Sequence, residues 1–308
     1  MTLPFTFMSS PNSSETLPIL ATAVTPWTAD WRLDAEAFAK QVRAIARELT
    51  RRIYIFGTAG EGHAVSDAQF REIATRFLAV ARDENVTPMI GVISMSLPTV
   101  IERIAWAREQ GCREFQISLP SWGALNDREL DVFFAETCGR FADCRFLHYN
   151  LQRTGRLLTA ADYRRLADAH PNFFWVKSSA SDPAIVRDFM ALRPRLQIFF
   201  TERGYTEARR HGDCGYLISI GSVHPSVAHK FVAADDTERT RLFGGIQAMG
   251  AKLRELAAGR FHMDGAFDKM LYKVSDPAFP LRLLPPYQGA TEEDFAAFRA
   301  AIPPEWRR

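Results

Sequence analysis

The sequence predicts an α/β protein built on a (β/α)8 TIM barrel with a C-terminal helical extension. Eight short apolar runs alternate with longer amphipathic runs between residues 19 and 220. The ends of the apolar runs recur at a mean interval of about 28 residues, which is the length of one βα unit. Eight such units in succession are typical of a closed barrel of parallel strands.

The eight apolar runs are expected to be the strands of this barrel. They are rich in β-branched and aromatic residues, and they are continuous rather than alternating in polarity, as in parallel strands that are buried on both faces. The expected strands are Ile19–Val24, Ile53–Phe56, Pro88–Ile93, Glu114–Leu119, Arg145–Tyr149, Phe173–Val176, Gln197–Phe200 and Gly215–Ile220.

The amphipathic runs are expected to be helices, and several carry a start signal. Ser66 and Gln69 have the spacing of a capping box, while Thr159 and either Asn126 or Asp127 are suited to be N-caps. The expected helices are Leu33–Leu49, Ser66–Arg82, Pro98–Gln110, Asp127–Arg140, Thr159–His170 and Pro183–Leu192.

An open, doubly wound sheet is the alternative arrangement for the same alternation of elements. Such a sheet usually carries a Gly-rich phosphate loop after its first strand. Here the first strand runs into Thr25-Pro26-Trp27, which has no glycine, so the barrel is favoured.

The chain continues beyond the eighth unit with three more helical runs. These are Thr237–Ala258, Met263–Tyr272 and Thr291–Ala300, and we expect them to pack on the barrel or on a neighbouring subunit. The expected organisation is a flexible N-terminal tail over residues 1–16, the barrel over residues 17–232 and a helical region over residues 233–308.

The composition argues against several classes of protein. Apolar residues make up 47% of the chain and charged residues 24%, as in ordinary globular proteins, and a net charge of +2 gives no strong field for nucleic acid or an acidic membrane surface. The N-terminus has no basic start, and its short apolar stretch is interrupted by Pro4 and Pro11. We therefore expect neither a signal peptide nor a membrane span, and we expect the protein to be cytoplasmic.

Cysteine and histidine give no sign of a disulfide framework or a metal site. The four cysteines, Cys112, Cys138, Cys144 and Cys214, form no C-x-x-C pair and are expected to be reduced, buried thiols. The seven histidines are dispersed and show no H-x-x-x-H spacing, so a metal-dependent barrel is not favoured.

Lys177 is the first candidate for chemistry, because catalytic residues in such barrels lie at the C-terminal ends of the strands. It follows the apolar run Phe173–Val176, where burial would penalise the ammonium form. A lysine that attacks a carbonyl must be neutral, so its pKa must fall from about 10.4 towards about 7–8. Only six of the 38 basic residues are lysines, and arginine cannot serve as such an amine. A lysine that merely extends its amine to solvent at a strand end is the alternative.

Three further segments supply partners for this amine. Tyr149 ends the fifth expected strand, one βα repeat before Lys177, so its phenol can exchange protons with a neighbouring intermediate. The segment Gly57-Thr58-Ala59-Gly60-Glu61 offers free backbone N–H groups for a carboxylate and the hydroxyl of Thr58 for a proton relay. Arg153 can grip a carboxylate in a bidentate fashion. Taken singly, each has an ordinary structural interpretation. Tyr149 can be a core tyrosine, the glycine-containing segment a tight turn, and Arg153 a solvated loop arginine.

Together these segments resemble the dihydrodipicolinate synthase / N-acetylneuraminate lyase family, over about residues 19 to 232 of this chain. The matching segments occur in order and are Thr22-Ala23-Val24-Thr25-Pro26, Gly57-Thr58-Ala59-Gly60-Glu61, Tyr149-Asn150 with Arg153-Thr154-Gly155, Val176-Lys177-Ser178-Ser179, and Gly215 with Ile218-Ser219.

The resemblance implies roles for these residues. Lys177 corresponds to the lysine that forms a Schiff base with pyruvate, Tyr149 to a proton-relay tyrosine and Thr58 to a relay threonine. Arg153 corresponds to an arginine that binds the carboxylate of the acceptor. Gly57, Ala59, Ile218 and Trp122 are further expected to lie at the substrate site. The resemblance also implies a homo-oligomer, a tetramer or a dimer, and no metal or organic cofactor.

The chain departs from the family pattern mainly in the acceptor half of the site. Ala59 stands where the family has a second threonine, and Pro120-Ser121-Trp122 stands where the synthases have Pro-Tyr-Tyr. Thr201-Glu202-Arg203-Gly204 replaces the family's Ser-Gly-Asp segment, and the loop after Tyr149-Asn150 is one residue short and lacks the usual proline.

The sequence therefore predicts a class I lyase or synthase that acts on pyruvate or another 2-oxo acid through a Lys177 enamine. Dihydrodipicolinate synthase activity, with aspartate semialdehyde as the acceptor, is one expectation. A sugar-acid or hydroxy-oxo-acid aldolase or dehydratase is the alternative within the family. A barrel that binds a 2-oxo acid without turnover is the alternative of another class.

Overall fold

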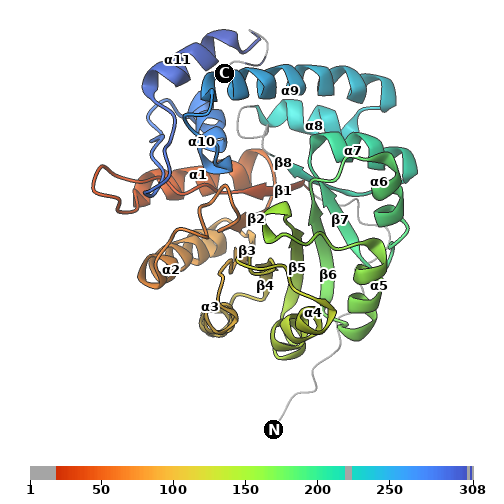
Figure 1. Cartoon of the computed structure of the whole chain (residues 1–308). Coiled ribbons are helices and arrows are strands. Elements are labelled where there is room, and N and C mark those ends of the chain that lie inside the picture. Colours follow the sequence, from red (N-terminus) through yellow and green to blue (C-terminus); the bar gives the residue numbers. More distant parts are fainter. Residues whose placement is uncertain (1–18, 219–223, 304–305, 307–308) are drawn as a thin grey trace.

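The predicted TIM barrel is confirmed by the computed structural model, which describes residues 19–218, 224–303 and 306 (Figure 1). Eight parallel strands close into a barrel in the order of the sequence, so each strand pairs with its neighbours along the chain. They are β1 (Ile19–Thr22), β2 (Arg52–Ile55), β3 (Thr87–Gly91), β4 (Glu114–Ile117), β5 (Arg145–Asn150), β6 (Phe173–Ser178), β7 (Gln197–Phe200) and β8 (Gly215–Ile218).

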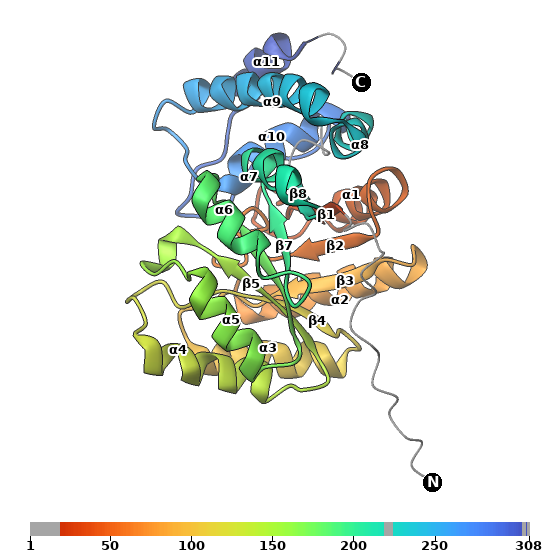
Figure 2. The same cartoon turned by 90° about the vertical axis from the view of Figure 1, so that its right-hand side faces the viewer.

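Helices surround the strands on the outside of the barrel (Figures 1 and 2). The six predicted barrel helices are present, and five of them have ends within two residues of the prediction. They are α1 (Ala35–Glu48), α2 (Asp67–Asp83), α3 (Leu97–Glu109), α4 (Asp127–Phe134), α5 (Ala160–Ala169) and α6 (Pro183–Met190). The capping box of Ser66 and Gln69 is present, and Asn126 and Thr159 cap α4 and α5.

The structure also differs from the sequence prediction in places. The helix expected to run to Arg140 is α-helical only to Phe134 and continues as the π-helical turn Ala135–Gly139. Helices α7 (Glu202–Ala208) and α8 (Pro225–Ala233) were not predicted. The last two residues of the eighth predicted strand, and the predicted tail over residues 1–16, lie outside the described residues.

The apolar side chains of the barrel pack on both sides of its strands. The larger cluster lies between the strands and the surrounding helices. A smaller cluster fills the barrel interior with large side chains from seven of the strands, Leu20, Tyr54, Met89, Leu147, Trp175, Phe199 and Leu217. The next inward positions towards the carboxyl ends of the strands carry polar side chains, among them Gln116 and Lys177, which lie above this apolar floor.

The C-terminal helices stack beside the carboxyl ends of β8 and β1 (Figures 1 and 2). Helix α9 (Asp236–Ala257) packs against α7, α8 and α11 (Glu292–Ala301), and α10 (Asp264–Ser275) lies between this layer and the barrel. In the part of the chain that the structure describes, no helix is long and apolar enough to cross a membrane.

A buried ion pair joins α10 to the loop between β2 and α2. The Nζ atom of Lys269 lies 2.5 Å from Oε1 of Glu61, and neither side chain reaches solvent. The indole of Trp27 donates to the same carboxylate at 2.9 Å, and the backbone N–H of Leu284 donates to it at 2.7 Å. Because a buried charge is tolerated only when it is paired and hydrogen-bonded, these three donors make Glu61 the link between the barrel and its helical extension.

Replacing Lys269 by methionine is expected to lower the free energy of unfolding by about 3–5 kcal/mol, because the carboxylate of Glu61 is then buried without its cation. Denaturation in guanidinium chloride measures this loss. The matched control is Lys252→Met, which removes one partner of an exposed ion pair with Glu255 and should cost at most about 0.5 kcal/mol. Equal losses in the two variants would contradict a special role for the Glu61–Lys269 pair.

Candidate functional site

Lys177 lies inside the barrel near the carboxyl end of β6, and only 4% of its surface is exposed. Its Nζ atom is 2.9 Å from the hydroxyl of Tyr54 and 3.4 Å from Oε1 of Gln116. The same atom lies 3.8 Å from the ring centre of Tyr149. Removal from water, which disfavours the charged amine, lowers the pKa of Lys177 to about 7, although Asp264 and Asp268 oppose this shift. The amine is therefore neutral in a large share of molecules near neutral pH.

Tyr149 is the direct neighbour of Lys177 across the sheet, because the two residues pair in the register of β5 and β6. Burial raises the pKa of the Tyr149 phenol to about 12, against a hydrogen bond with Thr58 that lowers it. The phenol therefore keeps its proton at neutral pH and can pass it through Thr58. The other residue of this motif, Asn150, is structural, because its amide bonds both the N–H and the C=O of Leu158.

The loop after β2 brings Thr58 and Ala59 to the same cavity as Lys177. The glycines of this loop let its backbone pack closely against its neighbours. A Cβ atom on Gly57 would lie 2.6 Å from the ring of Tyr54, and one on Gly60 would lie 2.8 Å from the backbone of Phe56. Within the described residues, the backbone N–H groups of Thr58 and Ala59 have no acceptor in the chain. They are therefore available to a ligand's carboxylate.

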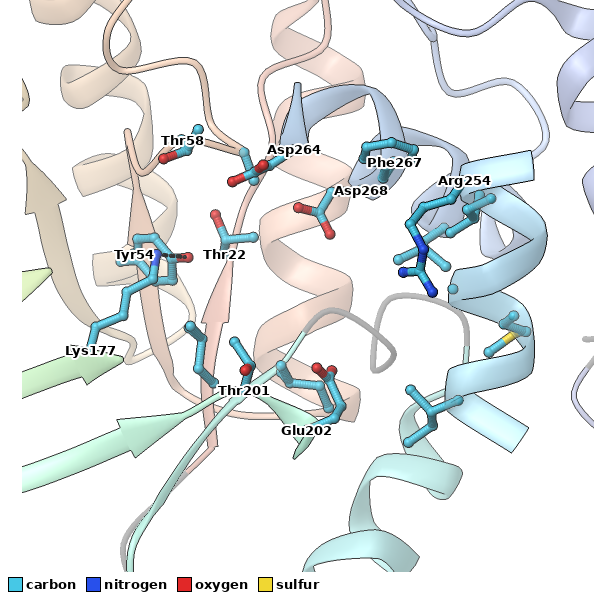
Figure 3. A pocket seen from close by; sticks show the side chains of 18 of the residues that line it. Thr22, Tyr54, Thr58, Lys177, Thr201, Glu202, Arg254, Asp264, Phe267 and Asp268 are labelled. Atoms are coloured by element: carbon cyan, nitrogen blue, oxygen red, sulfur yellow. Dashed lines mark hydrogen bonds between the residues drawn. The ribbon is translucent and has the colours of Figure 1, made fainter. Parts of the chain in front are cut away.

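These residues line one end of a cavity of about 370 Å³ between the barrel and helices α9 and α10 (Figure 3). The end at the barrel is polar and contains Lys177, Tyr149 and Thr58. The end at the helices is largely apolar and is lined by Ile246, Met249, Leu253, Phe267 and Leu271. A cavity of this size suits a small organic ligand.

Three carboxylates and one guanidinium also face the cavity. Asp264 and Asp268 lie one turn apart on α10, Glu202 begins α7, and Arg254 comes from α9 (Figure 3). Burial, together with the charges of Asp264 and Glu202, raises the pKa of Asp268 to about 8, while the charge of Lys177 opposes this shift. At neutral pH Asp268 is thus mainly a carboxylic acid that can donate a hydrogen bond.

The structure brings together most of the site residues predicted from the sequence. Lys177, Tyr149, Thr58, Ala59 and Ile218 all line the cavity. Gly57 lies directly behind Lys177, with its Cβ position 3.5 Å from Nζ.

Two of the predicted residues are placed elsewhere. Arg153 is half-exposed and does not line the cavity, but its guanidinium lies 3.3 Å from the carboxylate of Asp264, which does. Trp122 is 89% exposed on the loop after β4, away from the cavity of its own chain. Ser219, from the last matching segment, lies outside the described residues.

Five residues at or beside the cavity were not predicted from the sequence, namely Tyr54, Gln116, Arg254, Asp264 and Asp268. Tyr54 and Gln116 stand inside short strand sequences where they pass for core residues, and the only signal is that each is polar at an inward position near a strand end. The two aspartates have the i, i+4 spacing of one helix face, which is common on solvated helices. Within the described ranges, no group of three or more His, Cys, Asp or Glu side chains is arranged to hold a metal ion.

Comparison with known proteins agrees with this geometry. The model of the dihydrodipicolinate synthetase family matches residues 15–236. A 4-hydroxy-tetrahydrodipicolinate synthase of Exiguobacterium sp. (strain AT1b) is 26% identical over 57% of this chain and 59% of its own length. One from Thermus thermophilus is 28% identical over 49% of this chain and 50% of its own. The chain thus matches only about half of the length of these curated relatives.

Solved structures show the same fold over nearly the whole chain. A prophage protein of the dihydrodipicolinic acid synthase family from E. coli K12, solved with pyruvate, has a TM-score of 0.81 at 18% identity and covers 92% of this chain and 96% of its own. The dihydrodipicolinate synthase of Agrobacterium tumefaciens C58 has a TM-score of 0.78 at 21% identity, with 92% and 97% covered. The KD(P)GA of T. tenax has a TM-score of 0.79 at 20% identity, with 93% and 98% covered.

The family match covers most of the chain and spans the βα units that carry Thr58, Tyr149 and Lys177. This chain belongs to the dihydrodipicolinate synthetase family.

Proposed function

We propose that the protein is a class I lyase or synthase that forms a Schiff base between Lys177 and pyruvate or another 2-oxo acid. The observation that carries this proposal is the environment of the Lys177 amine. It is buried beside a phenol and a relay hydroxyl, and its pKa of about 7 leaves it able to attack a carbonyl at neutral pH. Membership of a family of pyruvate-dependent lyases and synthases supports the same chemistry, as does the pyruvate bound in the relative from E. coli K12.

The proposed first step joins Nζ of Lys177 to the keto carbon of the 2-oxo acid. The carbon–oxygen bond then breaks, and the oxygen leaves as water with one proton from Nζ and one from the Tyr149 phenol. The protonated imine that remains draws electrons from the adjacent carbon, whose proton is lost to give the enamine. Tyr149 regains its proton through Thr58. The enamine carbon can then attack an aldehyde, and the same steps in reverse cleave an aldol.

The substrate carboxylate is proposed to bind at the loop after β2. Thr58 and Ala59 line the cavity with Lys177, and their N–H groups, which have no acceptor among the described residues, can donate to this carboxylate. Ala59 provides this backbone donor but no hydroxyl. Ile218, the last residue of β8, also lines the cavity.

The acceptor half of the cavity favours a second, more specific proposal, a sugar-acid or hydroxy-oxo-acid aldolase or dehydratase. Glu202, Asp264 and Asp268 offer oxygen atoms to hydroxyl groups, and Arg254 is the one cation among the described acceptor-side residues that line the cavity. Arg153, the predicted carboxylate ligand, is already engaged by Asp264. A hydroxylated aldehyde fits this surface better than an acceptor with a second carboxylate, such as aspartate semialdehyde, because like charges repel in a buried site.

A barrel that binds a 2-oxo acid without turnover remains the alternative of another class. A coupled assay with pyruvate and aspartate semialdehyde, and a cleavage assay with a panel of hydroxylated 2-oxo acids, separates the possibilities. Turnover in either assay excludes the binding protein, and turnover in the first alone supports the dihydrodipicolinate synthase reaction.

Incubation with pyruvate and sodium borohydride is expected to add one reduced pyruvate to the protein, with the modification on the peptide that contains Lys177. Borohydride traps the imine as a stable secondary amine, and intact and peptide mass spectra locate it. Lys177→Met should give no adduct, whereas Lys230→Met, which removes an exposed lysine, should label like the unchanged protein. An adduct on Lys177→Met would refute the proposed amine.

The rate of imine formation is expected to rise with pH around a midpoint near the Lys177 pKa of about 7. Below that pH the ammonium form has no lone pair, and above it the neutral amine is the main species. Trapping with cyanoborohydride, which reduces imines across this range, followed by mass spectrometry, measures the midpoint. A rate that rises only near pH ~10, the ordinary range of lysine, would show that the amine is not desolvated.

Asp268→Asn is expected to lower kcat/KM for a hydroxylated aldol substrate by about tenfold to a hundredfold, because one hydrogen bond to the acceptor is lost or misdirected. Trapping of pyruvate should persist, since Asp268 belongs to the acceptor half. Asp188→Asn, on the exposed face of α6, serves as the control. A loss of pyruvate trapping equal to the loss of turnover would contradict the division of the cavity into two halves.

A further inference from the structure

Tyr54 makes the shortest contact to the Lys177 amine, and neither the sequence motifs nor the proposed steps assign it a role. It lies on β2, is only 3% exposed, and places its hydroxyl 2.9 Å from Nζ (Figure 3). Burial raises the pKa of Tyr54 well above its usual value. It therefore remains a neutral phenol, whose oxygen accepts a hydrogen bond without the negative charge that would stabilise an ammonium.

Gln116 supplies the second contact to the same amine. It lies on β4, has no exposed surface, and presents Oε1 to Nζ at 3.4 Å. The oxygen end of the amide therefore faces the amine, and its Nε2 atom has no partner within the described residues. Tyr54 and Gln116 thus approach Nζ from strands other than β6.

We propose that Tyr54 and Gln116 hold the two hydrogens of the neutral Lys177 amine, so that its lone pair points into the cavity at the substrate carbonyl. A neutral amine has two hydrogens and one lone pair, and two fixed acceptors leave the lone pair only the remaining direction. This inference rests on the proposed Schiff-base function and adds to it the residues that aim the nucleophile.

The other buried lysines of the protein indicate that this arrangement is not merely a way to bury a lysine. Lys269 meets the carboxylate of Glu61 and a backbone carbonyl, and Lys273 meets the carbonyls of Pro277 and Phe279. Carboxylate and carbonyl oxygens suit an ammonium. The hydrogen-bond partners of Lys177 are a phenol and an amide instead, and among the described residues no carboxylate bonds it directly.

The arrangement also fits the imine that follows. When the Nζ–carbon bond has formed and the keto oxygen has left as water, Nζ has lost one hydrogen and keeps one. The acceptor at 2.9 Å, the hydroxyl of Tyr54, is the better placed to hold the hydrogen that remains. The hydrogen held by Gln116 at 3.4 Å is the one that leaves with the water.

Gly57 allows Tyr54 to keep this position beside the amine. A Cβ atom at residue 57 would lie 2.6 Å from the ring of Tyr54, so any larger side chain would displace the phenol from Nζ. Packing against Tyr54 thus requires a glycine at residue 57, independently of the conformation of the loop.

The test is pyruvate trapping with cyanoborohydride in Tyr54→Phe, which keeps the ring and removes only the hydroxyl. The plateau rate at high pH, where the amine is neutral, is expected to fall on the order of tenfold to a hundredfold, because the lone pair is no longer aimed. The midpoint of the pH profile should move down, because the ammonium also loses an acceptor. The charged and titratable groups that face the amine and its cavity are unchanged in this variant, namely Tyr149, Glu202, Arg254, Asp264 and Asp268.

Tyr205→Phe is the matched control, since Tyr205 is a buried tyrosine outside the cavity. Gln116→Leu should also lower the plateau rate, by less than Tyr54→Phe because the contact it removes is longer. A plateau rate in Tyr54→Phe equal to that of Tyr205→Phe would overturn the inference. If the unchanged protein itself gives no adduct, the proposed function fails first, so the two failures are distinguishable.

Discussion

The buried carboxylate of Glu61 is the interaction on which the architecture of the site depends. It accepts hydrogen bonds from the indole of Trp27 in the loop after β1, from the amine of Lys269 in α10, and from the backbone N–H of Leu284 in the segment that follows α10. Glu61 itself lies on the loop that carries Thr58 and Ala59, so one carboxylate fixes both walls of the cavity. Asp264 and Asp268 face Lys177 because Lys269, on the same helix, is anchored there. The helical extension is thereby part of the site rather than a separate cap.

The three buried lysines show how the partners of an amine decide what it can do. All three have lost most of their water, and desolvation lowers the pKa of Lys177 to about 7 and that of Lys269 to about 8. Lys269 regains much of its preference for charge from Glu61, which lies at contact distance. Among the described residues, the amine of Lys177 has only the phenol of Tyr54 and the amide of Gln116 within hydrogen-bond distance. The carboxylates that act on its pKa, those of Asp264 and Asp268, lie across the cavity. The same residue type thus serves as a structural cation in α10 and, in the proposed function, as a nucleophile in β6.

The sequence was sufficient to predict the barrel and the grouping of Lys177, Tyr149 and Thr58 at one cavity, because the relevant signals are local. Strand ends recur at regular spacing, and the register that pairs Tyr149 with Lys177 follows from one βα repeat. Tyr54 and Gln116 could not be found in the same way, because their role depends on which strand neighbours point inward at one height of a closed barrel. Asp264 and Asp268 depend on the packing of α10, which the Glu61–Lys269 pair fixes across more than 200 residues of sequence. Helix α7 was missed because its seven residues are too short to show an amphipathic pattern.

The two halves of the cavity are coupled through charge, which constrains how the acceptor half can be built. An ionised carboxylate near Lys177 raises the pKa of the amine and reduces the share of the nucleophilic form. Two adjacent aspartates on α10 would do this strongly if both were charged. Burial instead raises the pKa of Asp268 to about 8, with the charges of Asp264 and Glu202 acting in the same direction, so Asp268 is mainly protonated near neutral pH. A protonated Asp268 can donate to an acceptor oxygen and does not add an anion beside the amine, so the burial of Asp268 is what allows an acidic side chain to lie near a neutral lysine.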